Sequence, residues 1–403
     1  MRSLEDARER ILRAVEPLSP IELPLSEAHG CVLAADVMAE YDVPPFSSAG
    51  ADGYAARAAD IHAATEEASV ALRLVGRSEG GRPPDATVGW GEAVRVVAGA
   101  PIPSGADCVV PDDRALPEGD SVAILGAAEA GESVDPAGRD LRAGEVLVPG
   151  GRKLAAPELA ALAGAGQPAP PVYPKVRVAV LPVGEGMVEA GRPAAFGQRR
   201  EAASFVAIGA LRDAGAVPYR VGIVPPDEHE IREAVLTNLA RADCFVCTVG
   251  GSDEDLDPDR LVGLGPIEYE DVAMFPGMVH GFARIEGVPF FVLPASPVST
   301  FVVFEMLVRP AILRMMGRRD VSRPQVQAVL DEGVSGPSGV TLFAPALVAH
   351  REGEWRAHPT AGADPDHLSG LVRANGLVEI PPGETEASGG DEVRVRIFRP
   401  LER

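Results

Sequence analysis

The pattern of hydrophobic and polar residues changes character along this chain of 403 residues. Residues 46–140 hold short β-type runs separated by Gly- and Pro-rich turns, which is typical of a small, mostly β domain. Residues 173–317 alternate apolar strands with amphipathic helices, and this predicts a parallel sheet covered on both faces. Short β runs return from residue 318. We therefore predict a multidomain α/β plus β fold around a three-layer αβα parallel-sheet domain.

Capping signals locate the helices more closely. Ser3 precedes an amphipathic run and Asp6 follows three residues later, which predicts a helix start. Pro157 fits the first turn of a second helix. The central domain is predicted to contain strand 177–184, helix 204–215, strand 217–226, helix 227–242, strand 243–251, strand 288–299 and helix 300–317.

Polar loops rich in Gly or Pro follow three of these strands. They are residues 183–186, 249–257 and 293–299. Ligands bind at the carboxyl ends of parallel strands, so we expect these loops to converge on one pocket. Gly250 and Gly251 offer backbone donors to a phosphate, or they simply make a turn. Asp253 and Asp257 belong to a run of carboxylates that is either a solvated acidic loop or a Mg²⁺ site.

The charge of the chain narrows its partners. A formal net charge of −22 argues against nucleic acid and against an anionic membrane surface, since both are recognised by basic faces. The sequence shows no signal-peptide pattern and no long apolar run, which predicts a cytoplasmic protein with reduced cysteines. Cys244 and Cys247 form a CxxC inside an apolar strand, and without a second ligand pair zinc is not expected.

One loop cannot build a core. The segment PPFSSAGADGYAAR (44–57) has almost no large apolar residue and carries Asp52. Functional side chains concentrate in such loops, and an Asx-turn that folds the loop on itself is the alternative. The motifs of hydrolase triads, NTPases and dehydrogenases do not occur. His280 is interpreted as structural, with contact to a ligand as the alternative.

Four segments match one protein family in order and over nearly the whole chain. They are PPFSSAGADGYA (44–55), VAGAPIPSGADCVV (97–110), GRDLRAGEVL (138–147) and LPASPVS (293–299). They resemble the family segments PPFDNSAMDGYA, TGAPIPxGADxVV, G-x-D-hydrophobic-x-x-G-E and LPGNPVS. The chain therefore resembles the MoeA family of molybdenum-cofactor biosynthesis, which shares its fold with the E-domain of gephyrin.

The resemblance implies an elongated protomer of four domains and an obligate homodimer. Its cleft would lie between the sheet domain of one subunit and the small β domain of the other. The domains would be 1–45 with 141–172 (linker and dimerisation), 46–140 (the β-rich domain carrying Asp52), 173–317 (molybdopterin binding) and 318–403 (C-terminal β domain).

The resemblance also implies an enzyme, a molybdopterin molybdenumtransferase with Mg²⁺ as cofactor. The family takes adenylylated molybdopterin, releases AMP and inserts molybdate into the dithiolene. Further expected partners are a molybdopterin adenylyltransferase and molybdoenzymes.

Site residues carry over by position in the matching segments. The candidate catalytic residues are Asp52, Asp140 and Glu185. The candidate Mg²⁺ ligands are Asp253 and Asp257. The residues expected to bind substrate are Gly53, Tyr54, Gly99, Ala100, Pro101, Thr248, Gly250, Gly251, Ser252, Pro276, Gly277, Pro294, Ser296, Pro297 and Ser299.

Several of these positions depart from the family pattern. The family's KPGKP segment reads Phe275-Pro276-Gly277-Met278-Val279, so apolar side chains replace two lysines. An oxyanion such as molybdate needs positive charge or oriented donors, so this change weakens the implied site. The other departures are Gly184-Glu185-Gly186-Met187 for GDEL, Ala98 for the threonine of TGAPIP, Glu201-Ala202-Ala203 for Asp-Ser/Thr-Asn, and Ser296 for the asparagine of LPGNPVS.

These departures leave a second hypothesis. A catalytically silent paralogue, acting as a dimeric ligand-binding or scaffold protein, would keep the framework segments and lose site residues. The gephyrin E-domain acts in this way when it grips a partner peptide. A sugar- or nucleotide-binding enzyme on a similar sheet has only fold-level analogy behind it.

Overall fold

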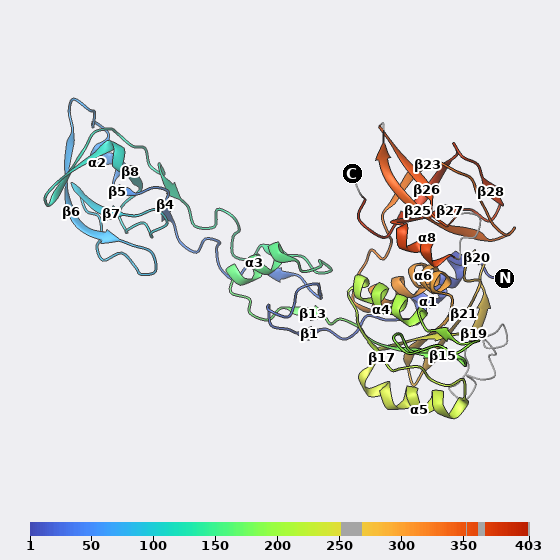
Figure 1. The fold of residues 1–403 in the computed structure, drawn as a ribbon. Coiled ribbons are helices and arrows are strands. Elements are labelled where there is room, and N and C mark those ends of the chain that lie inside the picture. Colours follow the sequence, from blue (N-terminus) through green and yellow to red (C-terminus); the bar gives the residue numbers. More distant parts are fainter. Residues whose placement is uncertain (251–267, 352, 362–366, 402–403) are drawn as a thin grey trace. The chain divides into compact units, whose positions relative to one another are not determined.

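The computed structural model describes residues 1–250, 268–351, 353–361 and 367–401. They form two compact units, each described by itself (Figure 1). Unit 1 contains residues 1–22, 30–34 and 171–403, and unit 2 contains residues 23–29 and 35–170. No helix in the described ranges is long and apolar enough to cross a membrane.

The central sheet of unit 1 has the strand order β17-β14-β18-β22-β21-β19. Its parallel strands, all predicted, are β17 (Val217–Arg220), β14 (Arg177–Val183), β18 (Cys244–Val249) and β22 (Val288–Pro294). An antiparallel edge that the apolar pattern did not indicate is added by β21 (Val279–Ile285) and β19 (Glu268–Asp271). Glu286 and Gly287 join β21 to β22 with φ of 49° and 84°, the positive values that a two-residue hairpin turn favours.

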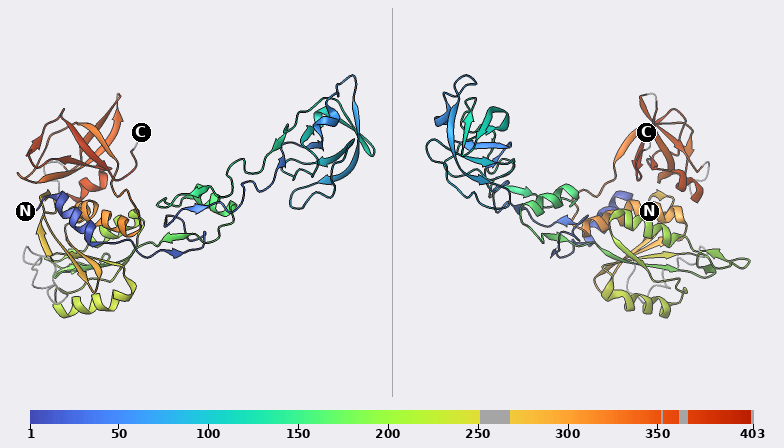
Figure 2. Two further views of the ribbon diagram at one scale, coloured as in Figure 1. Left: turned by 180° about the vertical axis from the view of Figure 1, so that it is seen from behind. Right: turned by 60° about the vertical axis from the view of Figure 1, so that its left-hand side comes forward.

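Helices cover both faces of this sheet (Figure 2). One face packs against α1 (Leu4–Ala14), α4 (Ala203–Ala214) and the helical run after β22. The other face packs against α5 (Glu228–Asn238). Alternating residues of β18 serve the two cores, with Cys244 in the first and Cys247 in the second. The three-layer αβα domain is confirmed, and so is the capping of α1, where the Ser3 hydroxyl accepts from the Asp6 N–H at 3.1 Å.

The apolar helix after β22 starts earlier than predicted and is interrupted. It consists of α6 (Pro297–Val303), the π-helical segment η4 (Phe304–Val308) and α7 (Arg309–Met315). The Arg309 N–H donates to the Phe304 carbonyl, five residues back, as in a π-turn. Pro310 has no N–H to donate to the Met306 carbonyl, which explains why regular α-helical bonding breaks here.

The C-terminal part of unit 1 is a closed β structure. Its strands are β23 (Gln325–Leu330), β25 (Thr341–Arg351), β26 (Glu354–Pro359), β27 (Gly376–Ile380) and β29 (Glu392–Ile397). Since β25 pairs with both β26 and β27, the sheet closes on itself around an apolar core. The short strand β20 (Met274–Phe275) pairs with β25, and α8 (Leu368–Arg373) lies against it.

Unit 2 is mostly β, as predicted. Its main sheet has the order β8-β5-β7-β6-β10-β9. The strands are β5 (Gly53–Ala56), β6 (Val70–Ser78), β7 (Glu92–Val96), β8 (Cys108–Pro111), β9 (Ala115–Glu118) and β10 (Ser121–Ile124). The helices are α2 (Ala58–Ile61) and α3 (Ala156–Gly164), and Pro157 lies in the first turn of α3 as predicted.

Short strands complete both units and, among the described residues, form one three-stranded sheet and four two-stranded pairs. They are β1 (Ile21–Glu22), β2 (Val32–Leu33), β3 (Val37–Met38), β4 (Ser48–Ala49), β11 (Val134–Asp135), β12 (Val146–Val148), β13 (Pro171–Tyr173), β15 (Met187–Val188), β16 (Arg199–Arg200), β24 (Val334–Ser335) and β28 (Glu386–Ala387). The four-domain division remains a prediction.

Candidate functional site

Asp52 lies on the turn into β5 of unit 2, and its exposed carboxylate is held by a distant backbone group. Oδ1 accepts a hydrogen bond from the Ala98 N–H at 2.7 Å. The carboxylate therefore joins two segments instead of closing a local Asx-turn. Gly53 follows because a Cβ at this position would lie 2.1 Å from the Val110 carbonyl oxygen. Only glycine lets β5 approach β8 this closely.

The segment 97–101 is bonded to the Asp52 loop at several points. The Gly99 N–H donates to the Ala49 carbonyl at 2.8 Å, and the Ala49 N–H donates to the Ala100 carbonyl at 2.9 Å. The Ser78 hydroxyl donates to the Pro101 carbonyl at 2.7 Å. The structure thus brings the predicted residues Gly99, Ala100 and Pro101 together with Asp52. Ala98, where the family has threonine, contributes its backbone N–H, a group that the side-chain change leaves intact.

Arg95 is a residue of this site that the sequence pattern did not reveal. Its Nη1 donates to the Gly53 carbonyl at 3.0 Å, and its guanidinium forms a two-pronged ion pair with Asp112. It also lies over the Tyr54 ring, 4.9 Å from the centroid. The hydrogen bond to Asp112 is the largest cause of the raised pKa of Arg95. Tyr54 is buried in the core below, so its role here is to support Arg95. An arginine inside the apolar strand AVRVV was the available signal.

Asp140 is exposed on a segment that runs beside the start of the same loop. Its backbone N–H donates to the Val43 carbonyl at 2.9 Å, and the Gly138 N–H donates to the Pro44 carbonyl at 2.9 Å. Within the described residues no hydrogen bond joins the Asp140 carboxylate to Asp52. The structure therefore brings the two segments together, and it does not pair the two carboxylates.

The second group of predicted residues lies at the carboxyl ends of the strands in unit 1. A Cβ on Gly184 would lie 2.1 Å from the Gly250 carbonyl oxygen, and a Cβ on Gly250 would lie 2.0 Å from the Ala295 Cβ. The loops after β14, β18 and β22 are therefore packed directly on one another. The described parts of the three loops thus lie together at this end of the sheet, and the pocket that they were expected to line stays a prediction. Glu185 is exposed on the first of them.

Two side-chain hydrogen bonds join the loop after β22 to α6. The Ser296 hydroxyl caps α6 by accepting from the Ser299 N–H at 3.4 Å, and the Thr300 hydroxyl donates to the Pro294 carbonyl at 2.5 Å. Pro297 occupies the first turn of α6. Thr248, near the end of β18, is buried.

The segment that replaces KPGKP packs on the same helix. Gly277 has a φ of 94°, and a Cβ there would lie 2.6 Å from Val303 Cγ2 and 3.3 Å from the Ser299 carbonyl oxygen. Pro276 is buried beside it, and Met278 is exposed. The loop keeps its glycine-dependent shape although both lysines are absent.

A charged cluster at this end of the sheet was also missed by sequence reasoning. Arg220, the last residue of β17, donates to Glu189 at 2.7 Å, to Glu201 at 3.1 Å and to the Ser204 hydroxyl at 2.8 Å. Glu201 in turn accepts from the Ser204 N–H at 2.7 Å. Glu201 stands where the family has Asp-Ser/Thr-Asn, and Arg220 neutralises it. An arginine within the otherwise apolar run VPYRVGIV was the signal.

Some predicted residues cannot be placed. Gly251, Ser252, Asp253 and Asp257 lie outside the described residues. In the part of the chain that the structure describes, no group of three His, Cys, Asp or Glu side chains forms a metal site. Cys244 and Cys247 are buried in strand β18 as predicted, and burial raises the pKa of both thiols.

Three regions of the chain match protein-family models. The fold defines a multidomain protein built on a molybdopterin-binding type of α/β domain: residues 179–314 match the family model described as a probable molybdopterin binding domain. Residues 2–166 match the MoeA N-terminal region (domain I and II), and residues 327–398 match the MoeA C-terminal region (domain IV). The chain belongs to the MoeA family.

The sequence and the fold of this chain are also similar to those of individual proteins over almost their full length. The chain is 32% identical to molybdopterin molybdenumtransferase 2 and 34% identical to molybdopterin molybdenumtransferase 1 of Mycobacterium tuberculosis. These matches cover 98% of this chain, with 99% of the first relative and 98% of the second. The crystal structure of a molybdopterin biosynthesis MoeA protein from Pyrococcus horikosii superposes with a TM-score of 0.86 at 29% identity, covering 99% of both chains.

Proposed function

We propose that this protein is a molybdopterin molybdenumtransferase of molybdenum-cofactor biosynthesis, which takes adenylylated molybdopterin, inserts molybdate into the dithiolene and releases AMP. The observation that carries the proposal is the Asp52 carboxylate, presented to solvent by the turn at Gly53 and fixed by the Ala98 N–H. The full-length similarity to two molybdenumtransferases supports it.

Asp52 is suited to activating a nucleophile. Oδ1 is occupied by the Ala98 N–H, and among the described residues Oδ2 has no hydrogen-bond donor. Oδ2 is therefore available to accept a proton from a water molecule, whose oxygen forms a new bond to a phosphorus of the phosphoanhydride in the adenylylated substrate. The bond from phosphorus to the bridging oxygen breaks, and AMP leaves. Asp140 and Glu185 are proposed as further acidic groups of this cleft.

The packed loops of unit 1 are proposed to hold the substrate. Pro294, Ser296, Pro297 and Ser299 would shape the pterin pocket, and Gly250 would offer a backbone donor to the phosphate. The locked geometry from Pro294 to Thr300 supports this role, since a pocket wall that is already ordered loses little entropy on binding.

The proposed function includes a Mg²⁺ cofactor and a homodimer. The predicted Mg²⁺ ligands, Asp253 and Asp257, lie outside the described residues, and no step is assigned to the ion. A homodimer would bring Asp52 of one subunit to the loops at the carboxyl ends of the parallel strands in the other subunit. A silent scaffold paralogue is not favoured, because the chain keeps Asp52 with its supporting contacts and resembles the transferases over its whole length.

The test measures AMP release from adenylylated molybdopterin in the presence of molybdate. The Asp52→Asn variant should lose AMP release by about 10²–10⁴-fold, the range typical of a general acid or base. Asp113→Asn is the matched control, because Asp113 is an exposed aspartate of the same unit and the charge change is identical. Wild-type protein that binds the substrate and releases no AMP would support the scaffold hypothesis instead.

A further inference from the structure

Among the described residues, unpaired positive charge is scarce near the loops after β14, β18 and β22, here called the strand-end loops. The lysines of the chain lie elsewhere, Lys153 in unit 2 and Lys175 just before the amino end of β14. Arg220 forms ion pairs with both Glu189 and Glu201, so this cluster has one cation for two carboxylates. Its excess negative charge repels an anionic substrate. The proposed substrate contains a phosphoanhydride, and its binding therefore calls for a cation that is not already paired.

Two exposed arginines, Arg199 and Arg200, lie beside the first of these loops. They form strand β16, which pairs in parallel with β15, and β15 directly follows the loop after β14. The Arg199 N–H donates to the Gly186 carbonyl at 3.0 Å, and this bond fixes β16 to the end of that loop. Within the described part of the chain, neither arginine side chain has a hydrogen-bond or ion-pair partner. Both are therefore free to bind a ligand.

The pairing of β15 with β16 places the two arginines on opposite faces. Met187 pairs with Arg199, and Val188 pairs with Arg200. Residues that pair directly across a ladder point to the same face, whereas consecutive residues of one strand alternate between the faces. Arg199 therefore shares a face with Met187, and Arg200 shares the other face with Val188.

Met187 shows which face lies against the strand-end loops. A Cβ on Gly184 would lie 2.5 Å from Met187 Cε and 2.1 Å from the Gly250 carbonyl oxygen. The Met187 side chain thus reaches the point where the loops after β14 and β18 meet. Arg199 is on this face, so its long side chain has access to a ligand bound at these loops, and Arg200 is directed away from them.

We propose that Arg199 contacts the substrate of the transferase and binds the phosphoanhydride of adenylylated molybdopterin. The inference rests on the proposed function, which supplies the identity of the substrate. A guanidinium suits this ligand, because its N–H donors contact two phosphate oxygens at once. Arg200 carries the same charge one residue further on and has no such role, since it lies on the opposite face.

The test compares Arg199→Gln with Arg200→Gln, a matched control that removes the same charge from the adjacent exposed residue. Equilibrium binding of adenylylated molybdopterin, and kcat and KM for AMP release, are measured for both variants and for the wild type. Arg199→Gln should weaken substrate binding and raise KM about tenfold or more while kcat changes little, because the contact is made to substrate and transition state alike. Arg200→Gln should leave binding and KM nearly unchanged. Arg199→Lys should keep part of the affinity, since it retains the charge and loses the two-pronged geometry.

Ionic strength gives a readout that a merely structural role would not change. The substrate affinity of the wild type should fall as the NaCl concentration rises, because salt screens an exposed charge contact. This dependence should be shallower in Arg199→Gln than in Arg200→Gln. Equal salt dependence in the two variants would contradict a direct charge contact at Arg199.

The binding measurement separates this inference from the proposed function. Equal substrate affinity in Arg199→Gln and Arg200→Gln would overturn the inference, whether or not the wild type releases AMP. A fall in kcat at unchanged affinity and KM would also overturn it, because Arg199 would then not hold the bound substrate. Wild-type protein that binds the substrate and releases no AMP would refute the proposed reaction alone, and the affinity comparison would still decide the role of Arg199. Wild-type protein that does not bind adenylylated molybdopterin would refute both.

Discussion

Asp52 owes its position to three neighbours that act through the backbone. Gly53 lets the chain pass within contact distance of Val110, the Ala98 N–H holds the carboxylate, and Arg95 binds the Gly53 carbonyl from below. Each contact restrains a different atom of the turn. The orientation of one carboxylate therefore rests on glycine geometry and on an arginine that lies outside the loop itself.

The first prediction concerns the space at Gly53. Gly53→Ala would place a Cβ 2.1 Å from the Val110 carbonyl oxygen. Since backbone atoms must shift to make room, the free energy of unfolding should fall by roughly 3 kcal/mol. Gly80→Ala is the matched control, because a Cβ there meets nothing within 4 Å, and its unfolding free energy should change by less than about 1 kcal/mol. Urea unfolding followed by circular dichroism measures the unfolding free energy of both variants. Equal losses would show that β5 can shift away from β8 at little cost, which would contradict the prediction.

A second prediction concerns Arg95 as a positioning residue. Arg95→Gln removes the ion pair with Asp112 and weakens the support of the Gly53 carbonyl, so kcat for AMP release should fall about 10–100-fold while KM changes little. Arg95→Lys should restore part of kcat. Arg73→Gln is the control, since Arg73 forms an ion pair in the same sheet and is 69% exposed. A large rise in KM at constant kcat would instead make Arg95 a substrate contact.

Site residues could be predicted from the sequence only where the residue type itself indicates a functional or structural role. Asp52, the glycines and the strand-end loops were predictable because their composition excludes a core or demands a special backbone. Arg95, Arg220 and the Ala98 N–H were not, because their partners lie on other strands or act through backbone atoms. The loss of both KPGKP lysines was evident from sequence, whereas the retained shape at Gly277 needed coordinates.

At the scale of elements, strand β21 shows how an unpredicted hairpin changes the environment of one residue. Its pairing with β22 places His280 in the sheet, where the side chain is 2% exposed and its Nδ1 has no hydrogen-bond partner among the described residues. Burial lowers the pKa of His280 to about 4 from its usual 6.5. The interpretation of His280 as a structural residue is consistent with this burial.

The third prediction follows from proton linkage at His280. In the unfolded chain His280 binds a proton below about pH 6.5, whereas in the folded protein it remains neutral down to about pH 4. Stability is therefore unaffected above pH 7 and falls as the pH drops through this window, by about 2 kcal/mol at pH 5. Urea unfolding at pH 7.5 and pH 5 should show that His280→Gln loses less stability than the wild type by that amount. The exposed His62→Gln should retain the full loss, and a wild-type-like slope in His280→Gln would refute the assignment.

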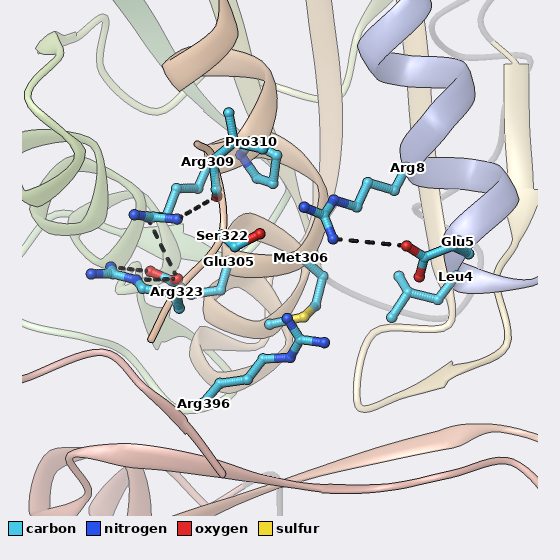
Figure 3. A pocket seen from close by; sticks show the side chains of 11 residues that line it. Leu4, Glu5, Arg8, Glu305, Met306, Arg309, Pro310, Ser322, Arg323 and Arg396 are labelled. Atoms are coloured by element: carbon cyan, nitrogen blue, oxygen red, sulfur yellow. Dashed lines mark hydrogen bonds and ion pairs between the residues drawn. The ribbon is translucent and has the colours of Figure 1, made fainter. Parts of the chain in front are cut away.

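Elements were predictable where periodicity and capping agree, as in α1, α4, α5 and the four parallel strands. The antiparallel edge was missed because the Glu286–Gly287 turn lacks the usual Asn-Gly or Asp-Gly signal. The π-helical segment was missed because an apolar run with a proline inside it reads as one helix. Glu305 lies in that segment and forms a two-pronged ion pair with Arg323 (Figure 3). The irregular helix therefore determines where this buried carboxylate meets its cation.

At the scale of the whole molecule, the two groups of candidate site residues belong to different units. Asp52 and its neighbours belong to unit 2, and the strand-end loops belong to unit 1. The proposed homodimer gives a reason for this division, since each cleft would take one group from each subunit. Light scattering should then report twice the chain mass of 42.0 kDa. A mass equal to one chain would remove the shared cleft.

The fourth prediction tests whether the cleft is shared. Asp52→Asn removes the acidic group, while Ser296→Asp repels an anionic substrate and still offers an oxygen to cap α6. Each variant alone should be nearly inactive. After the two are unfolded and refolded together at equal amounts, about half of the dimers are mixed, and each mixed dimer holds one cleft with both groups intact. The mixture should then recover about one quarter of wild-type AMP release, since half of the clefts in half of the dimers are restored. Each variant refolded alone is the control, and no recovery in a mixture shown to contain mixed dimers would place both groups of one cleft in the same chain.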